Sequence, residues 1–238
     1  MQCVILAGGL ATRMRPLTEQ IPKALIPVEG TPFIDHQLDW LAAHGVDEVV
    51  LSIGYRGEML RAHVGDGARY GLAVRHVDEG PNLRGTAGAL RLALDEGVLR
   101  ESFLVTYGDS FLPVDFGSVF AAFEAAAQPA LMTVFRNEGR WDTSNVIFDG
   151  RMVTLYDKQR RTRPAEEFTF IDYGLLAFQR QVIADAVPAG GKADLAGPLH
   201  DLSLRGQLAG LEIKERFYEI GSPVGLEDFS AWVRQQHR

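Results

Sequence analysis

Short β-type segments alternate with helix-type segments through the first half of the chain, and this alternation is the strongest constraint on the fold. The segments are, in order, 3–6, 33–44, 48–53, 58–64, 73–77, 86–94 and 103–106. Such alternation predicts βαβ units on a largely parallel sheet. Val49–Leu51 and Leu104–Val105 are apolar at consecutive positions, as in strands covered by helices on both faces. We therefore expect an α/β fold with a mostly parallel sheet flanked by helices.

The second half of the chain has a looser pattern and is expected to form a smaller lobe laid against the first. Its β-type runs are 130–135, 146–148, 153–156 and 168–178, and its helix-type runs are 119–127 and 224–236. No composition typical of a linker, no repeat and no low-complexity tract separates the halves. We expect a single domain over residues 1–238, with halves of about 1–115 and about 116–238.

Composition and charge exclude several classes of protein. With a net charge of −7 and no basic stripe, the chain is not expected to bind nucleic acid. Its apolar runs are far shorter than the ~20 residues of a membrane span, and we see no leader at the N-terminus. Cys3 is the single cysteine and lies in an apolar run, which favours a core position and a reducing, cytoplasmic compartment. The six histidines show no metal-binding spacing.

A glycine-rich loop follows the first β-type run and reads Ala7-Gly8-Gly9-Leu10-Ala11-Thr12-Arg13-Met14-Arg15-Pro16-Leu17-Thr18. Adjacent glycines let backbone N–H groups approach phosphate oxygens, and an arginine fork can neutralise a polyphosphate. A simple strand-to-helix turn would not need Thr12-Arg13 together with the later Pro22-Lys23. The loop lacks the spacings of dinucleotide folds and of P-loops. We therefore interpret it as a triphosphate-binding loop of another class.

This loop and the segment after it closely resemble the signature of the sugar-phosphate nucleotidyltransferase family, G-G-x-G-T-R-x-x-P-L-T followed by P-K-x-x-x-P. The second part here reads Pro22-Lys23-Ala24-Leu25-Ile26-Pro27, and Ala11 stands where the family usually has glycine. The resemblance covers nearly the whole chain. It implies a three-layer Rossmann-like (GT-A-like) fold with a smaller sugar-binding β lobe. It also implies that the first half binds the nucleotide and the second half the sugar phosphate.

The resemblance implies an in-line displacement in which the phosphate oxygen of a sugar 1-phosphate attacks the α-phosphorus of an NTP. Such an oxygen needs no side-chain base, so catalysis is positioning and charge neutralisation. Arg13 would hold the leaving pyrophosphate, Lys23 the α-phosphate and Lys158 the acceptor phosphate. The residues expected to bind the nucleotide are Leu6, Ala7, Gly8, Gly9, Thr12, Arg13, Glu79, Gly85 and Thr86.

A carboxylate follows another apolar strand, in Tyr107-Gly108-Asp109. This places Asp109 at the carboxyl end of the sheet, where ligands of open α/β folds bind, although a turn aspartate would look the same. The resemblance implies that Asp109 is a Mg²⁺ ligand. Its expected partner is Glu219 in Tyr218-Glu219-Ile220-Gly221-Ser222-Pro223, where the family has aspartate. Mg²⁺ is typically held by one or two carboxylates plus phosphates.

Candidate residues for the acceptor lie in the second half. Asp157-Lys158 resembles the family's E-K pair, with Lys158 on the phosphate and Asp157 on a sugar hydroxyl, although a surface ion pair is nearly as good an explanation. Asn145 replaces a family glycine, and Asp172 and Gly174 lie where relatives carry N-x-G or T-G. These changes suggest an acceptor other than glucose 1-phosphate.

The base-binding loop is expected at 79–89, which resembles the family's L-G-T-G-G/A-A segment. The Glu79 carboxylate is an acceptor that matches the donors of guanine or cytosine. This favours GTP or CTP, although an exposed glutamate before a turn explains the residue almost as well.

The sequence therefore predicts an enzyme that makes an NDP-sugar and pyrophosphate from an NTP and a heptose or hexose 1-phosphate, and a homodimer is possible. One alternative is a cytidylyltransferase for a phosphorylated amino alcohol or polyol, which an aromatic cage of Trp141, Tyr156 and Tyr173 would support. Another is a non-catalytic nucleotide sensor, because Ala11, Asp157 and Glu219 depart from the family pattern.

Overall fold

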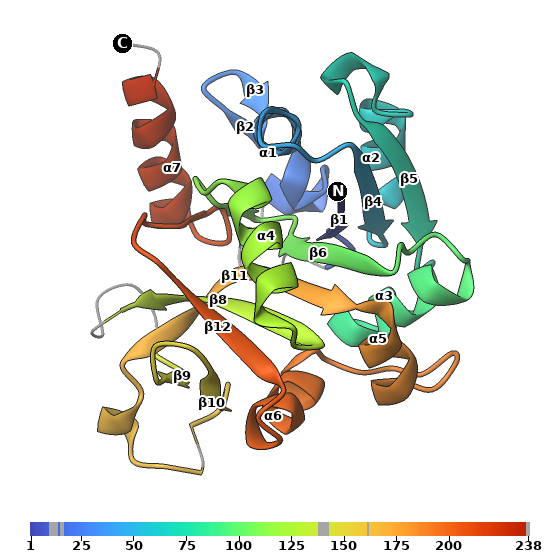
Figure 1. The fold of residues 1–238 in the computed structure, drawn as a ribbon. Coiled ribbons are helices and arrows are strands. Elements are labelled where there is room, and N and C mark those ends of the chain that lie inside the picture. Colours follow the sequence, from blue (N-terminus) through green and yellow to red (C-terminus); the bar gives the residue numbers. More distant parts are fainter. Residues whose placement is uncertain (10–13, 15–16, 138–142, 161, 237–238) are drawn as a thin grey trace.

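The computed structural model describes residues 1–9, 14, 17–137, 143–160 and 162–236. Within these residues nine strands form one sheet (Figure 1): β1 (Gln2–Leu6), β4 (Glu48–Ile53), β5 (Ala73–Asp78), β6 (Ser102–Tyr107), β8 (Ala130–Arg136), β9 (Val146–Phe148), β10 (Val153–Tyr156), β11 (Phe170–Gln179) and β12 (Leu208–Ile213). The strand order is β10-β9-β11-β6-β1-β4-β5, and β8 pairs with both β11 and β12.

The first half of the chain forms the parallel part of this sheet. Strands β6, β1, β4 and β5 are parallel neighbours, as the βαβ pattern predicted. The second half continues the same sheet, because β11 pairs antiparallel with β8 along one side and with β6 and β9 along the other. The predicted α/β class, with a largely parallel sheet flanked by helices, is confirmed.

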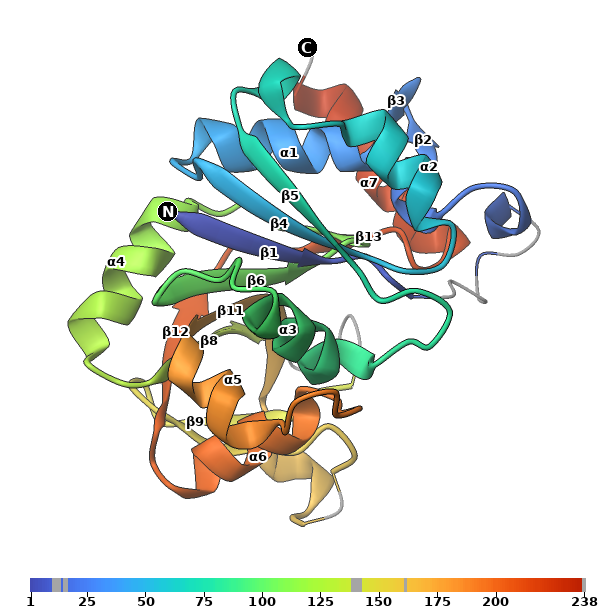
Figure 2. The same cartoon turned by 90° about the vertical axis from the view of Figure 1, so that its right-hand side faces the viewer.

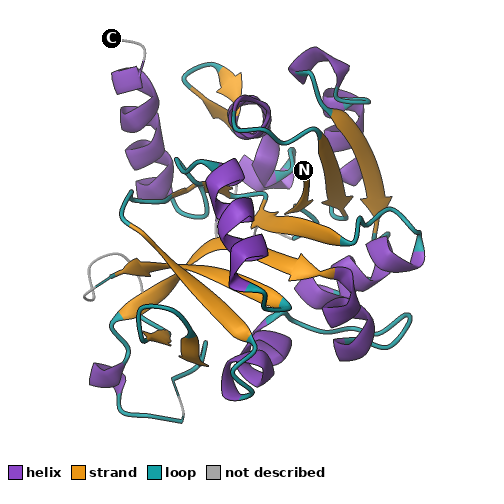
Figure 3. Cartoon of the chain, viewed as in Figure 1, coloured by secondary structure: helices purple, strands orange, loops and turns teal. Residues whose placement is uncertain are grey.

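Helices cover both faces of the sheet (Figures 2 and 3). One face carries α1 (Phe33–Ala43), α2 (Gly57–Val64) and α4 (Phe116–Ala126), and the other carries α3 (Gly85–Asp95), α5 (Arg180–Ala186) and α6 (Ala196–Leu204). Strand β1 feeds both cores, since Cys3 and Ile5 face the first layer and Val4 the second. Helix α1 ends before Gly45, whose φ of +84° suits a helix stop.

A third apolar cluster joins the C-terminal helix α7 (Pro223–Gln236) to the N-terminal half. It contains Phe33, Phe111, Phe229 and, at its edge, Trp232. The short elements around it and elsewhere are β2 (Pro27–Val28), β3 (Thr31–Pro32), β7 (Ser110–Phe111), β13 (Tyr218–Glu219) and the 3₁₀ turns η2 (Leu17–Glu19), η3 (Lys23–Leu25), η4 (Ala68–Tyr70) and η5 (Ala165–Glu167). Strand β13 pairs with β7, which brings the chain just before α7 alongside the carboxyl end of β6.

None of the described helices is long and apolar enough to cross a membrane. The predicted segments correspond to strands and helices of the structure, whereas α5, α6 and β12 were not predicted.

Candidate active site

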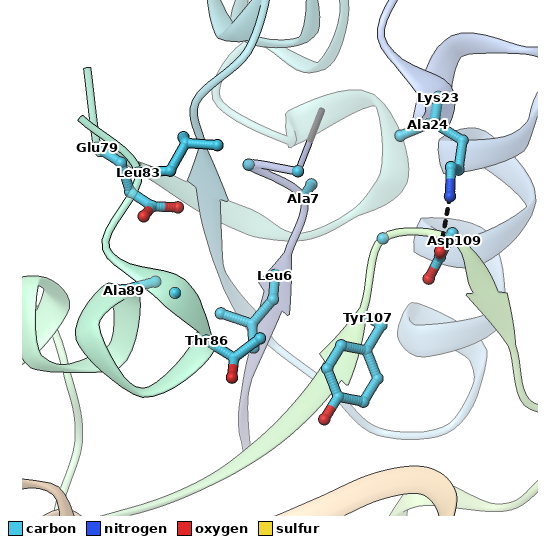
Figure 4. Close-up of a pocket in the computed structure, with 14 residues that line it drawn as sticks. Leu6, Ala7, Lys23, Ala24, Glu79, Leu83, Thr86, Ala89, Tyr107 and Asp109 are labelled. Atoms are coloured by element: carbon cyan, nitrogen blue, oxygen red, sulfur yellow. Dashed lines mark hydrogen bonds and ion pairs between the residues drawn. The ribbon is translucent and has the colours of Figure 1, made fainter. Parts of the chain in front are cut away.

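A pocket of about 250 Å³ lies at the carboxyl ends of β1 and β6 (Figure 4). Its lining includes all the predicted nucleotide-binding residues that the structure describes, together with Lys23 and Asp109: Leu6, Ala7, Gly8, Gly9, Lys23, Glu79, Gly85, Thr86 and Asp109. Thr12 and Arg13 lie outside the described residues. The pocket also includes Ala24, Leu83, Ala89, Tyr107 and Gly108, which sequence reasoning did not single out.

Gly8 is packed against Glu79. A Cβ on Gly8 would lie 2.4 Å from the Glu79 Oε1 atom, so only glycine fits at this position without a shift of Glu79. The Gly8 carbonyl accepts a hydrogen bond from the Tyr55 amide at 3.2 Å, which fixes the start of the loop against the end of β4. The loop predicted to bind phosphate and the loop predicted to bind the base are therefore in direct contact.

The Glu79 carboxylate is partly used by its own loop, because Oε2 accepts a hydrogen bond from the Arg84 amide at 2.7 Å. Burial is the largest influence on this group and raises its pKa. A carboxylate in this position can accept hydrogen bonds from the edge of a base and has none to donate while ionised.

Lys23 and Asp109 form an ion pair in the pocket, with Lys23 Nζ 2.9 Å from Asp109 Oδ2. The lysine side chain is only 14% exposed, so its charge is weakly screened by solvent. The main-chain oxygen of Asp109 accepts a hydrogen bond from the Ile220 amide at 2.9 Å. The main chain of Asp109 is thus held by the C-terminal segment, whereas its carboxylate faces the pocket.

Glu219, the second predicted metal ligand, is bound by its own segment. Its carboxylate accepts hydrogen bonds from the Gly221 amide and from Ser222 Oγ, the latter at 2.6 Å. A Cβ on Gly225, in the first turn of α7, would collide with the same carboxylate. Among the described residues there is no group of three or more metal-ligating side chains. The pairing of β13 with β7 therefore brings Glu219 near Asp109, but both Glu219 carboxylate oxygens accept hydrogen bonds from the residues just before α7.

The loop predicted to bind the base, at the start of α3, is held by a segment from the second half of the chain. The Ala193 carbonyl accepts hydrogen bonds from the Ala87 and Gly88 amides at 3.0 and 3.1 Å. Thr86 Oγ1 accepts one from the Leu195 amide at 2.8 Å. The segment after α5, which contains Gly190 and Gly191, is thus docked on the first turn of α3.

Lys158 and Asp194 line a second cavity of about 590 Å³ and lie 3.5 Å apart, Nζ to Oδ1. Asp157 also lines it, but its carboxylate holds the following turn by accepting hydrogen bonds from the amides of Gln159 and Thr162 and from the Thr162 hydroxyl. Asp194 was not predicted, because its partner Lys158 is distant in the sequence and no local pattern marks the pair.

Asn145, Asp172 and Gly174 form a hydrogen-bonded group beside this cavity. Asn145 Oδ1 accepts a hydrogen bond from the Asp172 amide at 3.0 Å, and Asp172 Oδ1 accepts one from the Gly174 amide at 3.0 Å. Burial raises the pKa of Asp172 to about 6, and the charge of Lys158 opposes this rise. Asn145 thus positions a neighbouring strand with its side-chain oxygen.

Tyr107 is close to residues predicted for both substrates. It lines the first pocket, and burial together with the carboxylates of Asp172 and Asp194 raises the pKa of its hydroxyl well above the usual value. The predicted acceptor residues are therefore close to the predicted nucleotide residues.

Of the three aromatic side chains proposed as a cage, the two that the structure describes, Tyr156 and Tyr173, do not converge. Tyr156 packs with the core on the α3 side of the sheet, and Tyr173 packs with the core on the α1 side. Trp141 lies outside the described residues.

The sequence pattern of the family described as nucleotidyl transferase matches residues 2–187. The chain spans about half the length of the first curated relatives it matches, with 46–54% of those proteins covered.

Two curated relatives are matched over a larger share of their length. One is the D-glycero-alpha-D-manno-heptose 1-phosphate guanylyltransferase of Aneurinibacillus thermoaerophilus, 33% identical over 66% of this chain and 68% of the relative. The other is the N-acetylmuramate alpha-1-phosphate uridylyltransferase of Neisseria meningitidis serogroup B, 28% identical over 97% of both chains. Among solved structures, a putative glucose-1-phosphate thymidylyltransferase from Bacillus anthracis superposes with a TM-score of 0.83 at 20% identity, covering 98% of this chain and 95% of the other.

Proposed function

The chain belongs to the nucleotidyl transferase family, and we propose that it transfers a nucleotidyl group from an NTP to a sugar 1-phosphate, giving an NDP-sugar and pyrophosphate. The observation that carries this proposal is the ion pair of Lys23 and Asp109 inside the pocket formed by the glycine loop and the base-binding loop. The Lys23 ammonium group can bind the phosphates of a nucleoside triphosphate, and the Asp109 carboxylate can bind the metal ion that accompanies them.

The proposed reaction is an in-line displacement that forms the bond between the acceptor phosphate oxygen and the α-phosphorus and breaks the bond from the α-phosphorus to the pyrophosphate. The acceptor phosphate is already an oxyanion, so no general base is needed. Lys23 holds the α-phosphate, Lys158 the acceptor phosphate and Arg13 the leaving pyrophosphate. Neutralising these charges in a pocket with limited solvent lowers the barrier.

Mg²⁺ is the proposed metal, and the residues present fit it in part. Asp109 offers a carboxylate oxygen at the pocket, now paired with Lys23, and the phosphates of an NTP would complete the oxygen ligands. When bound, the ion would neutralise the phosphate charge. Each Glu219 oxygen accepts one hydrogen bond, from Gly221 or Ser222, and keeps a further lone pair that can bind a metal ion.

The finer proposal is GTP or CTP with a heptose or hexose 1-phosphate. Glu79 supports the choice of base, because its carboxylate lines the pocket and accepts the hydrogen bonds that guanine or cytosine can donate. The heptose-specific guanylyltransferase among the relatives supports the choice of sugar.

Pyrophosphate release tests the proposal. The protein is mixed with Mg²⁺, each of the four common NTPs and a panel of sugar 1-phosphates, and nucleotide-sugar products are identified by mass spectrometry. Lys23→Met is expected to lower kcat/KM by about 10²–10⁴. Lys214→Met, which removes an exposed lysine away from the pocket, is the control and is expected to leave kcat/KM unchanged. Near-normal turnover of Lys23→Met would overturn the assignment, and NTP binding without pyrophosphate release from any acceptor would favour a nucleotide sensor.

A further inference from the structure

The turn that carries Asp109 is held by the side chain of Gln37, a residue of α1. The side-chain nitrogen Nε2 of Gln37 donates hydrogen bonds to the main-chain oxygen of Tyr107 at 2.9 Å and to that of Ser110 at 2.8 Å. Tyr107 is the last residue of β6 and Ser110 the first residue of β7, with Gly108 and Asp109 between them. One side chain therefore bridges the two ends of the turn.

This contact depends on the NH₂ group of the Gln37 amide. Both partners are carbonyl oxygens, which only accept hydrogen bonds, so the NH₂ group must face them. The Gln37 side chain is buried, with 4% of the residue exposed, so the two carbonyls would lose their donors if the amide were removed. A methionine of similar length donates no hydrogen bond and would leave both carbonyls without this partner.

The turn lies directly against the start of the glycine loop. A Cβ on Gly108 would lie 2.7 Å from the Ala7 Cβ atom, and the Gly108 amide donates to the Leu6 carbonyl at 2.9 Å. The Asp109 carboxylate faces the same pocket, where it is paired with Lys23 (Figure 4). The position of the turn therefore sets where the Asp109 carboxylate lies relative to the loop predicted to bind the triphosphate.

A divalent metal ion is sensitive to the position of such a carboxylate. Mg²⁺ binds oxygen ligands at about 2.0–2.1 Å and demands near-ideal octahedral geometry, so a small displacement of one ligand weakens its binding. The hydrogen bonds of the Gln37 amide reach the main chain on either side of Asp109 and leave the carboxylate oxygens to the pocket. Gln37 can thus influence a metal ion through the turn without touching the ion.

We propose that Gln37 is a positioning residue, which holds the turn of Asp109 in the geometry that the metal ion of the bound NTP requires. This inference rests on the proposed function and adds a residue to its site.

Mn²⁺ binding tests the inference without any turnover. Mn²⁺ suits the same oxygen ligands as Mg²⁺ and is followed by electron paramagnetic resonance. The ion is titrated into the protein saturated with the α,β-methylene analogue of whichever common NTP binds best. Its dissociation constant is expected to rise about tenfold in Gln37→Met, because partners that orient a metal ligand typically contribute this much to metal affinity. If the wild-type protein showed no nucleotide-dependent Mn²⁺ binding, the inference would be wrong.

Gln2→Met is the matched control, because Gln2 is a buried glutamine at the opposite end of β1 from the pocket. Its side chain donates to the Val98 carbonyl at 2.9 Å and accepts from the Arg100 amide at 2.8 Å, so this variant also loses two hydrogen bonds of a buried amide. Both variants are expected to unfold at lower urea concentration than the wild type, but only Gln37→Met should lose Mn²⁺ affinity. An equal loss of affinity in both variants would contradict a specific role of Gln37, and so would wild-type affinity in Gln37→Met.

Gln37→Asn decides the question if Gln37→Met does not fold. It keeps the NH₂ group on a side chain that is one carbon shorter and cannot hold both carbonyls as Gln37 does. We expect its Mn²⁺ dissociation constant to exceed the wild-type value, whereas wild-type affinity in folded Gln37→Asn would refute the role.

Steady-state kinetics separate this inference from the proposed function. Gln37→Met should raise the Mg²⁺ concentration that gives half-maximal kcat and leave the KM for the sugar 1-phosphate unchanged. Turnover with the wild-type Mg²⁺ dependence would overturn the inference and leave the proposed function intact. Mn²⁺ binding that depends on Gln37, in a protein that releases no pyrophosphate with any acceptor, would overturn the proposed function and leave the inference intact.

Discussion

At the scale of single residues, Asp172 is a group that costs the folded protein stability. Burial raises its pKa from 3.8 to about 6. A carboxyl with a higher pKa in the folded protein holds protons more tightly there than in the unfolded chain. Its contribution to folding is therefore unfavourable above pH 6 and disappears below the unfolded pKa. The shift corresponds to about 3 kcal/mol at neutral pH, a cost typical of functional sites.

Asp172→Asn is therefore expected to stabilise the protein. The free energy of unfolding should rise by about 1–3 kcal/mol near pH 7.5, and the gain should shrink as the pH falls from 6 towards 4, because the wild-type carboxyl becomes protonated. Urea unfolding of both proteins at several pH values measures this. The same gain at acidic and at neutral pH would show that the stabilisation does not come from removing a buried charge.

At the scale of elements, the sequence was most informative for the parallel half. Strands such as Glu48–Ile53 and helices such as Phe33–Ala43 have clear apolar patterns and clear ends. Two of the elements that were not predicted contain glycine or proline, which weaken the sequence pattern of a helix or strand. Helix α6 carries Gly197-Pro198 in its first turn, and β12 contains Gly210, where a Cβ would lie 2.3 Å from the Phe148 ring. Only tertiary packing shows why a glycine is needed at position 210.

The contact between α3 and the segment before α6 gives a prediction at this scale. A Cβ on Gly85 would lie 2.6 Å from the Ala193 carbonyl oxygen, and the φ of Gly85 is +74°. Gly85→Ala should therefore lower the free energy of unfolding by about 2 kcal/mol more than backbone strain alone, and should raise the KM for NTP by moving the base-binding loop.

Gly97→Ala is the matched control for this substitution. Gly97 also has a positive φ, of +68°, but nothing lies within 4 Å of the point that a Cβ would occupy, so this variant reports strain alone. Urea unfolding and NTP saturation curves are measured for both. Equal losses of stability and equal KM values would show that the Ala193 contact does not position the loop.

At the scale of the whole molecule, the two halves share one sheet through the pairing of β6 with β11. That the residues predicted to bind the nucleotide line one pocket follows from the sequence, because most of them come directly after strands and the carboxyl ends of parallel strands meet at one edge. The acceptor side was harder to predict, because Asp194 and Lys158 meet only through the docking of the segment after α5. The hydrogen bond from the Asp172 amide to Asn145 Oδ1 is also a tertiary contact that no motif records.

A continuous sheet predicts that the halves unfold together, and Cys3 provides the probe. This single thiol lies in the central strand β1, is fully buried, and has a pKa raised by burial, so it should react with a thiol reagent only when the sheet opens. Trp40 and Trp232 report on the separate cluster under α7. We expect Cys3 labelling, tryptophan fluorescence and far-UV circular dichroism to give coincident urea transitions. If the three transitions coincide, saturating NTP with Mg²⁺ should shift all of them to higher urea by the same amount, because a ligand of the native state stabilises every element that unfolds with it. Labelling of Cys3 at lower urea than the loss of circular dichroism would instead show that the parallel half opens alone.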